Sequence, residues 1–420
     1  MSWADNFTTR QGVTSLYADS SLSSLATTNY NTNDDIDGIG GGGELGTLYI
    51  DINDSDLQPN KTHLLYWYYI NGLAGTAIAI FGLLGNTVSI VILTHRTMRN
   101  STSILLIFMG VFDNVFLLLN LLLQTFPFIF AKHDICPEYI HVRQFLFRSF
   151  YAVVHMAHTG TIYMTMLVTV ERAMVVMRPL RAKYICTRRR AVLVSLAVLF
   201  WAVIYNIPRC LEYGTQNTVV QIDAESNTTT TELIVGKTEF AHSSFFNVYY
   251  LVYFNSIFHF IFPFFIICVL NAMIIARLIK RRRSVPRHQR GGIQVENETK
   301  LTVMILSLTA VFCICQVFAA VELIIVQLEK DYTAKLGHCS EACEGFSAFA
   351  ETLTIVNSAA NFLLYSIFGE KFRRACCKYV CPFIKPQTNG VALQRTSQSA
   401  LTSSYRGETF QLRHTDSLDS

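Results

Sequence analysis

The chain has 420 residues, of which 51% are hydrophobic and only 15% are charged. This composition is too apolar for an ordinary water-soluble protein. The formal net charge of +4 is small and gives no reason to expect a nucleic-acid partner. No phosphate-binding Gly-Lys-Ser/Thr loop, zinc-ligand spacing or nucleophile elbow occurs, so the sequence predicts no enzymatic activity.

Residues 1–64 are polar, rich in Ser, Thr and Asn, and include an acidic run followed by the glycines Gly40 to Gly43. Such a segment cannot bury a core, and we expect a disordered tail. The acidic run has the spacing of a calcium-binding loop, but no amphipathic helix flanks it, so the disordered tail is the preferred interpretation. Glycosylation sequons suit an extracellular location for this tail and stand at Asn6, Asn53 and Asn60.

Seven apolar blocks follow, and each meets the roughly 20 residues that a helix needs to cross a bilayer. They cover 67–94, 103–130, 144–175, 190–209, 246–278, 302–328 and 348–368. The sequence therefore predicts an all-α membrane protein, with a seven-transmembrane helix bundle over residues 65–368. Basic residues gather in the first, third and fifth connections, and the fourth connection carries a sequon at Asn227. The positive-inside rule then predicts a multi-pass plasma-membrane protein with its N-terminus outside and its C-terminus in the cytoplasm.

Residues 369–381 predict a short amphipathic helix along the inner membrane surface. In this helix we expect Phe372 to face lipid while Arg373 and Arg374 face anionic headgroups. Three cysteines in or next to it are candidates for palmitoylation: Cys376, Cys377 and Cys381. Residues 382–420 are rich in Ser and Thr and predict a disordered cytoplasmic tail.

Polar side chains at membrane depth are costly and mark candidate functional positions. Asp113 lies in the second block and needs a cation, a proton or a hydrogen-bond network. Thr161, Asn357 and Asn361 could share a cation site with it, and Asn86 in the first block is a further buried amide. We predict a polar network around Asp113, with a sodium ion as its candidate occupant, over an isolated protonated carboxyl. No other cofactor is expected.

Glu171 and Arg172 stand where the third block meets a basic connection. One interpretation is a solvated pair at a helix end. The other is an acid–base switch whose arginine reaches another helix when the bundle opens.

Several motifs in fixed order resemble the rhodopsin-like (class A) G-protein-coupled receptors: Gly85–Asn86, Asp113, Glu171–Arg172, Pro263 and Asn361–Tyr365. Four segments further resemble the invertebrate FMRFamide-type neuropeptide receptors: Thr169–Arg172, Met177–Ala182, Tyr205–Arg209 and Asn361–Phe372. The resemblance covers residues 67–381. It implies a receptor for an extracellular neuropeptide, with an RFamide as one candidate, that activates a heterotrimeric G protein through Glu171, Arg172, Asn361 and Tyr365. It also implies receptor kinases and arrestin acting on the Ser/Thr-rich tail.

This chain departs from the class pattern at several positions. Ala173 replaces the usual Tyr, Val317 and Ala319 replace a Trp and a Pro, and Asn271 and Phe362 replace a Tyr and a Pro. Loss of the proline at Ala319 removes the usual cause of a helix kink. An atypical receptor of the same fold, either non-signalling or constitutively active, or a ligand scavenger, is therefore the alternative.

The resemblance also implies a disulfide between the top of the third helix and the second outer loop. Cys136 lies 36 residues before Arg172, which at about 1.5 Å per residue is more than roughly 50 Å and too long for one helix. Cys136 therefore belongs to the preceding loop, and Leu211 to His242 contain no cysteine. Four outer cysteines permit three pairings. We favour Cys136–Cys210 together with Cys339–Cys343.

The sequence excludes two ligand classes. Glu351 to Tyr365 contain no lysine to bind retinal, and Phe147 to Met166 contain no aspartate to bind an amine. A basic, aromatic peptide would need carboxylates and aromatic surface near the outer opening, and the candidates are Gln124, Tyr151, His155, His158, Glu322 and Glu351. His155 and His158 could instead be packing residues or pH sensors, and Glu212 could be a solvated loop residue.

A channel or transporter is the competing class. It predicts a continuous polar path or broken inverted repeats. The polar residues here instead form one cluster at mid-membrane depth and one pair at the cytoplasmic end, which favours a receptor.

Overall fold

The computed structural model describes residues 65–133, 139–223, 228–284, 293–336 and 341–379. The first half contains η1 (Trp67–Gly75), α4 (Thr76–Thr94), α5 (Ser101–Asn120), η2 (Leu121–Thr125), α6 (Phe126–His133), α7 (Tyr139–Met177), α8 (Pro179–Ile185), α9 (Arg188–Tyr205) and α10 (Ile207–Cys210). The second half contains β1 (Tyr213–Asp223), β2 (Thr228–Lys237), α11 (Glu239–His242), η3 (Phe245–Phe254), η4 (Ser256–Ile261), α12 (Phe262–Ser284), α13 (Ile293–Leu336), α14 (Glu341–Phe368) and α15 (Glu370–Tyr379). The η segments are π-helical.

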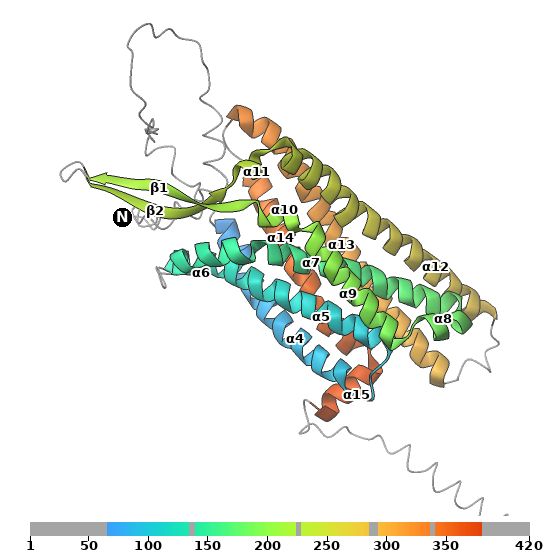
Figure 1. Cartoon of the computed structure of the whole chain (residues 1–420). Helices are drawn as coiled ribbons and strands as arrows, with labels where there is room; N and C mark the ends of the chain where they lie inside the picture. Colours follow the sequence, from blue (N-terminus) through green and yellow to red (C-terminus); the bar gives the residue numbers. More distant parts are fainter. Residues whose placement is uncertain (1–64, 134–138, 224–227, 285–292, 337–340, 380–420) are drawn as a thin grey trace, which may run out of the picture. The chain divides into compact units, whose positions relative to one another are not determined.

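The chain divides into two compact units, residues 1–372 and 373–420, and the helix bundle lies in the first. Within it α4 packs on α5 and α14, α5 packs on α7 and α9, α7 also contacts α12, and α13 packs on α14 (Figure 1). The long helices therefore lie side by side, with α7 in contact with most of the others. We call the end of the bundle that carries α6, α10 and the β1–β2 hairpin the hairpin end, and the opposite end the α8 end.

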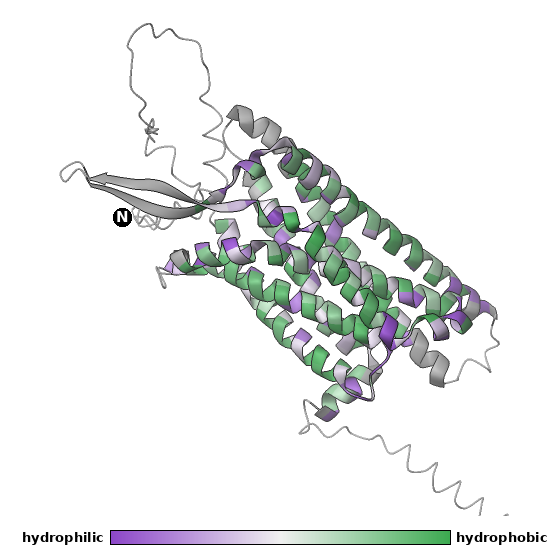
Figure 2. Ribbon diagram, in the orientation of Figure 1, coloured by the Kyte–Doolittle hydropathy of each residue, from purple (hydrophilic) through white to green (hydrophobic). Residues whose placement is uncertain are grey.

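The outer faces of the helices are apolar and the inner faces hold the polar groups. Phe200, Phe265 and Ile314 are 68%, 66% and 60% exposed, whereas Asp113 and Thr161 are buried. Hydrophobic residues run along the length of the bundle helices (Figure 2). Exposed apolar surface costs about 25 cal/mol per Å² in water. The inside-out pattern is therefore that of helices surrounded by lipid.

Among the residues that the structure describes, five helical stretches are long and apolar enough to cross a membrane: Trp67–Thr94, Ser101–Phe130, Val142–Met177, Phe245–Lys280 and Lys300–Ile325. Gly345–Phe368 also qualifies when it is taken together with the helix that follows it. The remaining predicted span is α9. It has only 18 residues and begins with three arginines, so it is too short and too charged to count among these stretches, although it packs on α5 and α7.

Local sequence explains where several helices begin. The Asn100 side chain accepts a hydrogen bond from the Ser103 amide at 2.7 Å and starts α5, and Thr187 caps α9 in the same way at 3.5 Å from the Arg190 amide. Pro179 occupies the first turn of α8. The α13 helix runs unbroken from Ile293 to Leu336, as expected from the absence of a proline at Ala319.

Small residues allow the helices to approach closely. A Cβ on Gly85 of α4 would lie 2.7 Å from the Phe362 side chain of α14, so only glycine permits this contact. The phenylalanine that replaces the usual proline at position 362 therefore packs directly on α4.

The β1–β2 hairpin was not part of the all-α prediction. Its strands are antiparallel, with Tyr213 opposite Lys237 and Asp223 opposite Thr228, and the register shifts between Val219 and Gln221. Both strands are rich in β-branched residues, above all threonine, which favours extended backbone. From sequence the whole connection is interpreted as a loop, because it lies between two far stronger apolar segments.

The predicted helix after the seventh span is present as α15. Arg373 and Arg374 are exposed, as expected, but the prediction that Phe372 faces lipid was wrong. Its ring is only 4% exposed and lies 6.2 Å from the Phe362 ring and 5.7 Å from the Tyr365 ring. Contact with two aromatic side chains of α14 buries this ring inside the protein.

Several predictions fall on residues that the structure does not describe. These are the two tails, the sequons at Asn6, Asn53, Asn60 and Asn227, and the cysteines Cys136, Cys339 and Cys381. Of the other candidate palmitoylation sites, Cys377 is exposed and Cys376 is half-buried.

Candidate functional site

A buried polar network joins three helices at the middle of the bundle. Asp113 on α5 accepts a hydrogen bond from the Thr161 hydroxyl of α7 at 2.9 Å and from the Asn361 amide of α14 at 2.6 Å. All three side chains are buried. The structure thus brings together three of the five residues that the sequence assigned to this site.

The other two residues lie nearby without bonding to the carboxylate. Asn86 donates to the Ser358 carbonyl oxygen at 3.0 Å, and Asn357 is buried but makes no hydrogen bond to Asp113. In the part of the chain that the structure describes, the Asn86 Oδ1 and Ser358 Oγ atoms are buried without a hydrogen-bond partner, as is the Tyr365 hydroxyl. A carboxylate, a hydroxyl and amide oxygens are the ligands that a hard cation prefers. These oxygen atoms therefore fit a sodium ion as its ligands.

Glu171 and Arg172 form an ion pair at the α8 end, with the Arg172 Nη2 and Glu171 Oε2 atoms 3.3 Å apart. Their side chains are only 6% and 7% exposed, so the interpretation as a solvated pair is wrong. Burying two charges costs about as much as their attraction returns. The buried pair is therefore weak evidence for a contribution to stability.

Two departures from the class pattern meet at a junction of three helices next to this pair. Ala173 of α7 is buried and packs in one cluster with Ile274 of α12 and Leu306 of α13. On the facing sides of α12 and α13, the Asn271 amide donates to the Thr309 hydroxyl at 2.8 Å. A tyrosine at position 173 would overfill this cluster. The small alanine lets α12 and α13 pack close to α7, and the hydrogen bond ties α12 to α13.

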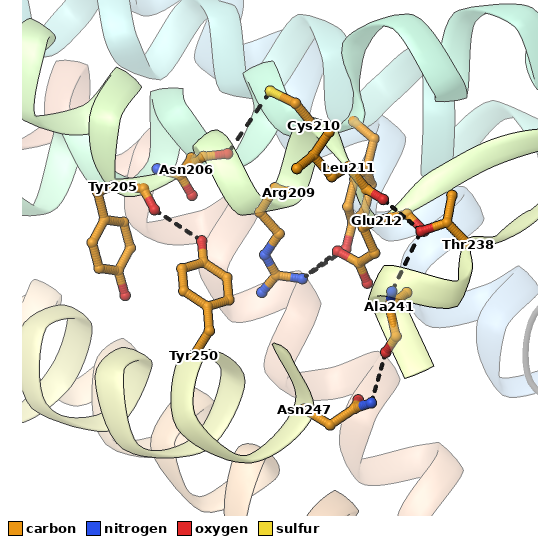
Figure 3. A network of polar contacts seen from close by, with 11 residues as sticks. Tyr205, Asn206, Arg209, Cys210, Leu211, Glu212, Thr238, Ala241, Asn247 and Tyr250 are labelled. Atoms are coloured by element: carbon orange, nitrogen blue, oxygen red, sulfur yellow. Dashed lines mark hydrogen bonds and ion pairs between the residues drawn. The ribbon is translucent and has the colours of Figure 1, made fainter. Parts of the chain in front are cut away.

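A second ion pair lies at the hairpin end and is centred on Arg209 of α10 (Figure 3). The Arg209 guanidinium donates to Glu212 at 3.0 Å and to the Tyr151 hydroxyl at 2.9 Å. It also lies 5.9 Å from the centres of the Tyr151 and Tyr250 rings. The interpretation of Glu212 as a solvated residue is therefore wrong, because the side chain is buried and paired.

This pair anchors the hairpin to the bundle. The Thr238 backbone amide donates to the Glu212 carbonyl oxygen at 3.0 Å, and the Thr238 hydroxyl caps α11 at the Ala241 amide, 3.4 Å away. Figure 3 shows that Tyr250 lies beside Arg209, and its hydroxyl donates to the Tyr205 carbonyl oxygen at 3.0 Å. Sequence reasoning did not single out Arg209, although it stands within the Tyr205–Arg209 motif.

Three predicted ligand-binding residues line α7 near this pair. The Tyr151 ring lies 4.7 Å from His155 and 4.8 Å from Tyr213, centre to centre. The His158 ring packs between Phe116 and His259, at 5.3 and 4.9 Å. Both histidines are thus part of an aromatic cluster, which agrees with a packing role.

The remaining predicted ligand-binding residues lie across the bundle. Glu322 lies on α13 and Glu351 on α14, two helices that pack on each other. Gln124 in η2 is half-buried and makes no hydrogen bond within the described part of the chain.

Each predicted disulfide joins one cysteine that the structure describes to one that it does not. Cys210 is exposed, and its Sγ lies 3.9 Å from the Asn206 carbonyl oxygen. Cys343 is buried on α14. Because Cys136 and Cys339 lie outside the described residues, both pairings stay predictions.

Lipid-facing helices around a buried polar core, with ionisable clusters toward opposite ends, define a multi-helix membrane protein. Residues 85–365 match the family described as 7 transmembrane receptor (rhodopsin family). This match covers more than half of the chain, and the chain belongs to that family. The predicted seven-helix bundle, with α9 as its fourth span, is thereby confirmed.

Named relatives agree with the resemblance to FMRFamide-type receptors. The chain is 26% identical over 308 residues to an FMRFamide receptor of Drosophila melanogaster, an alignment that covers 73% of this chain and 53% of that receptor. It is 24% identical over 349 residues to an FMRFamide peptide receptor of Caenorhabditis elegans, covering 79% and 74%. Neuromedin-U receptor 2 of Rattus norvegicus is 25% identical over 331 residues, covering 75% and 78%. The chain thus spans about half the length of the Drosophila receptor.

Proposed function

We propose that this chain is a plasma-membrane receptor that binds an extracellular peptide at the hairpin end and activates a heterotrimeric G protein at the α8 end. The observation that carries the proposal is the buried Glu171–Arg172 pair, 3.3 Å apart, at the end of the bundle opposite the acidic and aromatic clusters. The relatives are named as receptors for FMRFamide and neuromedin U, which supports a peptide ligand, with an amidated RFamide as the first candidate.

The distribution of charge supports this orientation. Basic residues gather at the α8 end, where α7 leads through α8 into α9: Arg178, Arg181, Lys183, Arg188, Arg189 and Arg190. The positive-inside rule assigns such an end to the cytoplasm. The hairpin end and the glycosylation sequons then face the exterior.

Activation in this proposal is a population shift between two arrangements of the bundle. In the arrangement described here, α12 and α13 pack on Ala173 of α7 next to Arg172. Movement of α13 away from α7 and α12 would break the Asn271–Thr309 hydrogen bond and open the surface around Arg172 to the G protein. A peptide drives this shift only to the extent that it binds the open arrangement more tightly.

The Asp113 network would stabilise the closed arrangement. Asp113, Thr161 and the unpaired Asn86 Oδ1 would hold a sodium ion, which neutralises the carboxylate when it is bound. Receptor kinases and arrestin would act on the Ser/Thr-rich tail, and palmitoylation of Cys376 and Cys377 would fix α15 to the inner membrane surface.

The test is a screen of amidated neuropeptides on cells that express the chain at their surface, with calcium and cAMP as readouts. We expect at least one RFamide to give a saturable response that the same peptide with a free C-terminal carboxylate does not give. Cells without the receptor are the control.

No response to any peptide, alongside confirmed surface expression, would favour a second candidate function, a non-signalling receptor or scavenger. The specific observations behind that candidate are the close packing around Ala173 and the uninterrupted α13 helix. A scavenger would bind and internalise peptide without a second-messenger response.

A further inference from the structure

Two histidines from different helical segments lie next to each other inside the bundle. His158 belongs to α7, and His259 belongs to η4, the π-helical segment that leads directly into α12. The centres of the two imidazole rings are 4.9 Å apart, and the ring planes are inclined at 62°. His259 is buried and His158 is half-buried. The fold therefore brings two imidazole groups together within the membrane-spanning part of the chain.

Aromatic packing explains the position of these rings but not their nitrogen atoms. The Phe116 ring lies 5.3 Å from the His158 ring, and the Tyr205 ring lies 6.4 Å from the His259 ring, centre to centre. Among the residues that the structure describes, however, the His158 Nε2 and His259 Nδ1 atoms are buried without a hydrogen-bond partner. A buried polar atom that loses its hydration and gains no partner is costly, and a phenylalanine would pack equally well without that cost. The two nitrogens are therefore candidates for binding a shared ligand.

The chemistry of two imidazoles selects a transition-metal ion. Imidazole nitrogen is a preferred ligand of zinc, copper and nickel, whereas magnesium and calcium prefer oxygen. Two imidazoles that share a tetrahedral zinc ion, each through a bond of about 2.0–2.1 Å, have ring centres about 5 Å apart. The observed separation of 4.9 Å agrees with this spacing. His259 also lies in a π-helical segment, a local irregularity that is frequent at functional sites.

We propose that His158 and His259 form a zinc-binding site that ties α7 to the segment leading into α12. In the part of the chain that the structure describes, no group of three or more His, Cys, Asp or Glu side chains could hold a metal ion, so these two histidines are the protein ligands. A tetrahedral ion then keeps two coordination positions for water or for a donor atom of a bound molecule. The site differs from the Asp113 network in its nitrogen ligands, and it does not depend on the proposed peptide.

The test uses the purified full-length chain in lipid nanodiscs and measures thermal unfolding over a range of buffered free zinc concentrations. We expect zinc chloride to raise the unfolding temperature in a saturable manner, and magnesium chloride at equal concentration to leave it unchanged. His158→Phe and His259→Phe keep an aromatic ring but remove the nitrogens, and each should weaken the apparent zinc affinity at least tenfold. His242→Phe removes an exposed histidine at the end of α11 and is the matched control, which should keep the wild-type zinc effect. A zinc effect that survives both His158→Phe and His259→Phe would overturn the proposal.

A second measurement uses only the wild-type protein and so does not depend on how the variants fold. X-ray absorption at the zinc edge, recorded with one equivalent of zinc per chain, should show two imidazole ligands at about 2.0–2.1 Å. A spectrum dominated by sulfur at about 2.3 Å would assign the zinc to cysteine thiolates, and one with oxygen ligands alone would assign it to carboxylates or water. Either spectrum would overturn the proposal. A silent peptide screen would refute the proposed function and leave a positive zinc result standing.

Discussion

Replacing Glu212 with Ala should destabilise the receptor strongly, because it leaves the charge of the buried Arg209 without its ion-pair partner. In the wild type the Arg209 guanidinium lies 3.0 Å from Glu212 and 2.9 Å from the Tyr151 hydroxyl, and the paired side chains are only 13% and 5% exposed. Breaking one partner of such a pair costs about 3–5 kcal/mol. Tyr151→Phe removes only a hydrogen bond to a charged donor, worth about 1.5–3 kcal/mol.

The double replacement of Arg209 by Met and Glu212 by Leu removes both charges and fills similar volume. Such exchanges are often neutral or stabilising, so this variant should unfold near the wild-type temperature. Thermal unfolding of the four ligand-free proteins in one detergent should therefore rank Glu212→Ala lowest, Tyr151→Phe next, and the double variant close to wild type. A Glu212→Ala protein as stable as the wild type, or a double variant as weak as Glu212→Ala, would refute the reasoning about the stranded charge.

Three further predictions concern other parts of the chain. Asp113→Ala leaves two buried donors without their acceptor and should cost about 2–6 kcal/mol, measured by thermal unfolding, whereas an unchanged protein would argue against the network. Asn271→Val or Thr309→Val removes the α12–α13 hydrogen bond, which is worth about 0.5–1.5 kcal/mol. Either variant should therefore raise basal G-protein activation about two- to tenfold. No rise would mean that this bond does not hold the closed arrangement. Burial, and after it the charge of Glu171, raises the pKa of the Cys186 thiol. Less thiolate is then present at neutral pH, so iodoacetamide should modify Cys186 more slowly, and with a pH profile shifted upward, than the same cysteine in a synthetic peptide of residues 180–192, as read by mass spectrometry. Equal rates would contradict the shift.

Sequence alone was sufficient for features that depend on composition along one segment. The first apolar block and the structural span both cover Trp67–Thr94, because a run of apolar residues has no alternative to a lipid-facing helix. The contact of Asp113 with Thr161 and Asn361 was also predictable, since a carboxylate at membrane depth requires hydrogen-bond donors.

Features that depend on distant neighbours were not predictable. Glu212 is buried only because Arg209 pairs with it and Tyr151, 58 residues before Arg209, completes the cluster. Phe372 turns inward only because Phe362 and Tyr365 offer it an aromatic surface. The hairpin was missed for another reason. Its strands pair only with each other, and their threonine-rich sequence gives a much weaker signal than the apolar blocks on either side.

The central claim is that Arg172 transmits peptide binding at the hairpin end to a G protein at the α8 end. Its most direct test is GTPγS binding in membranes from cells that express wild-type, Arg172→Ala or Arg178→Ala receptor, each titrated with an activating RFamide. Arg178 is an exposed arginine at the same end and controls for the loss of positive charge. We expect Arg172→Ala to abolish stimulated GTPγS binding while peptide affinity stays within a few-fold of wild type and Arg178→Ala signals. Undiminished signalling by Arg172→Ala at equal surface expression would contradict the account.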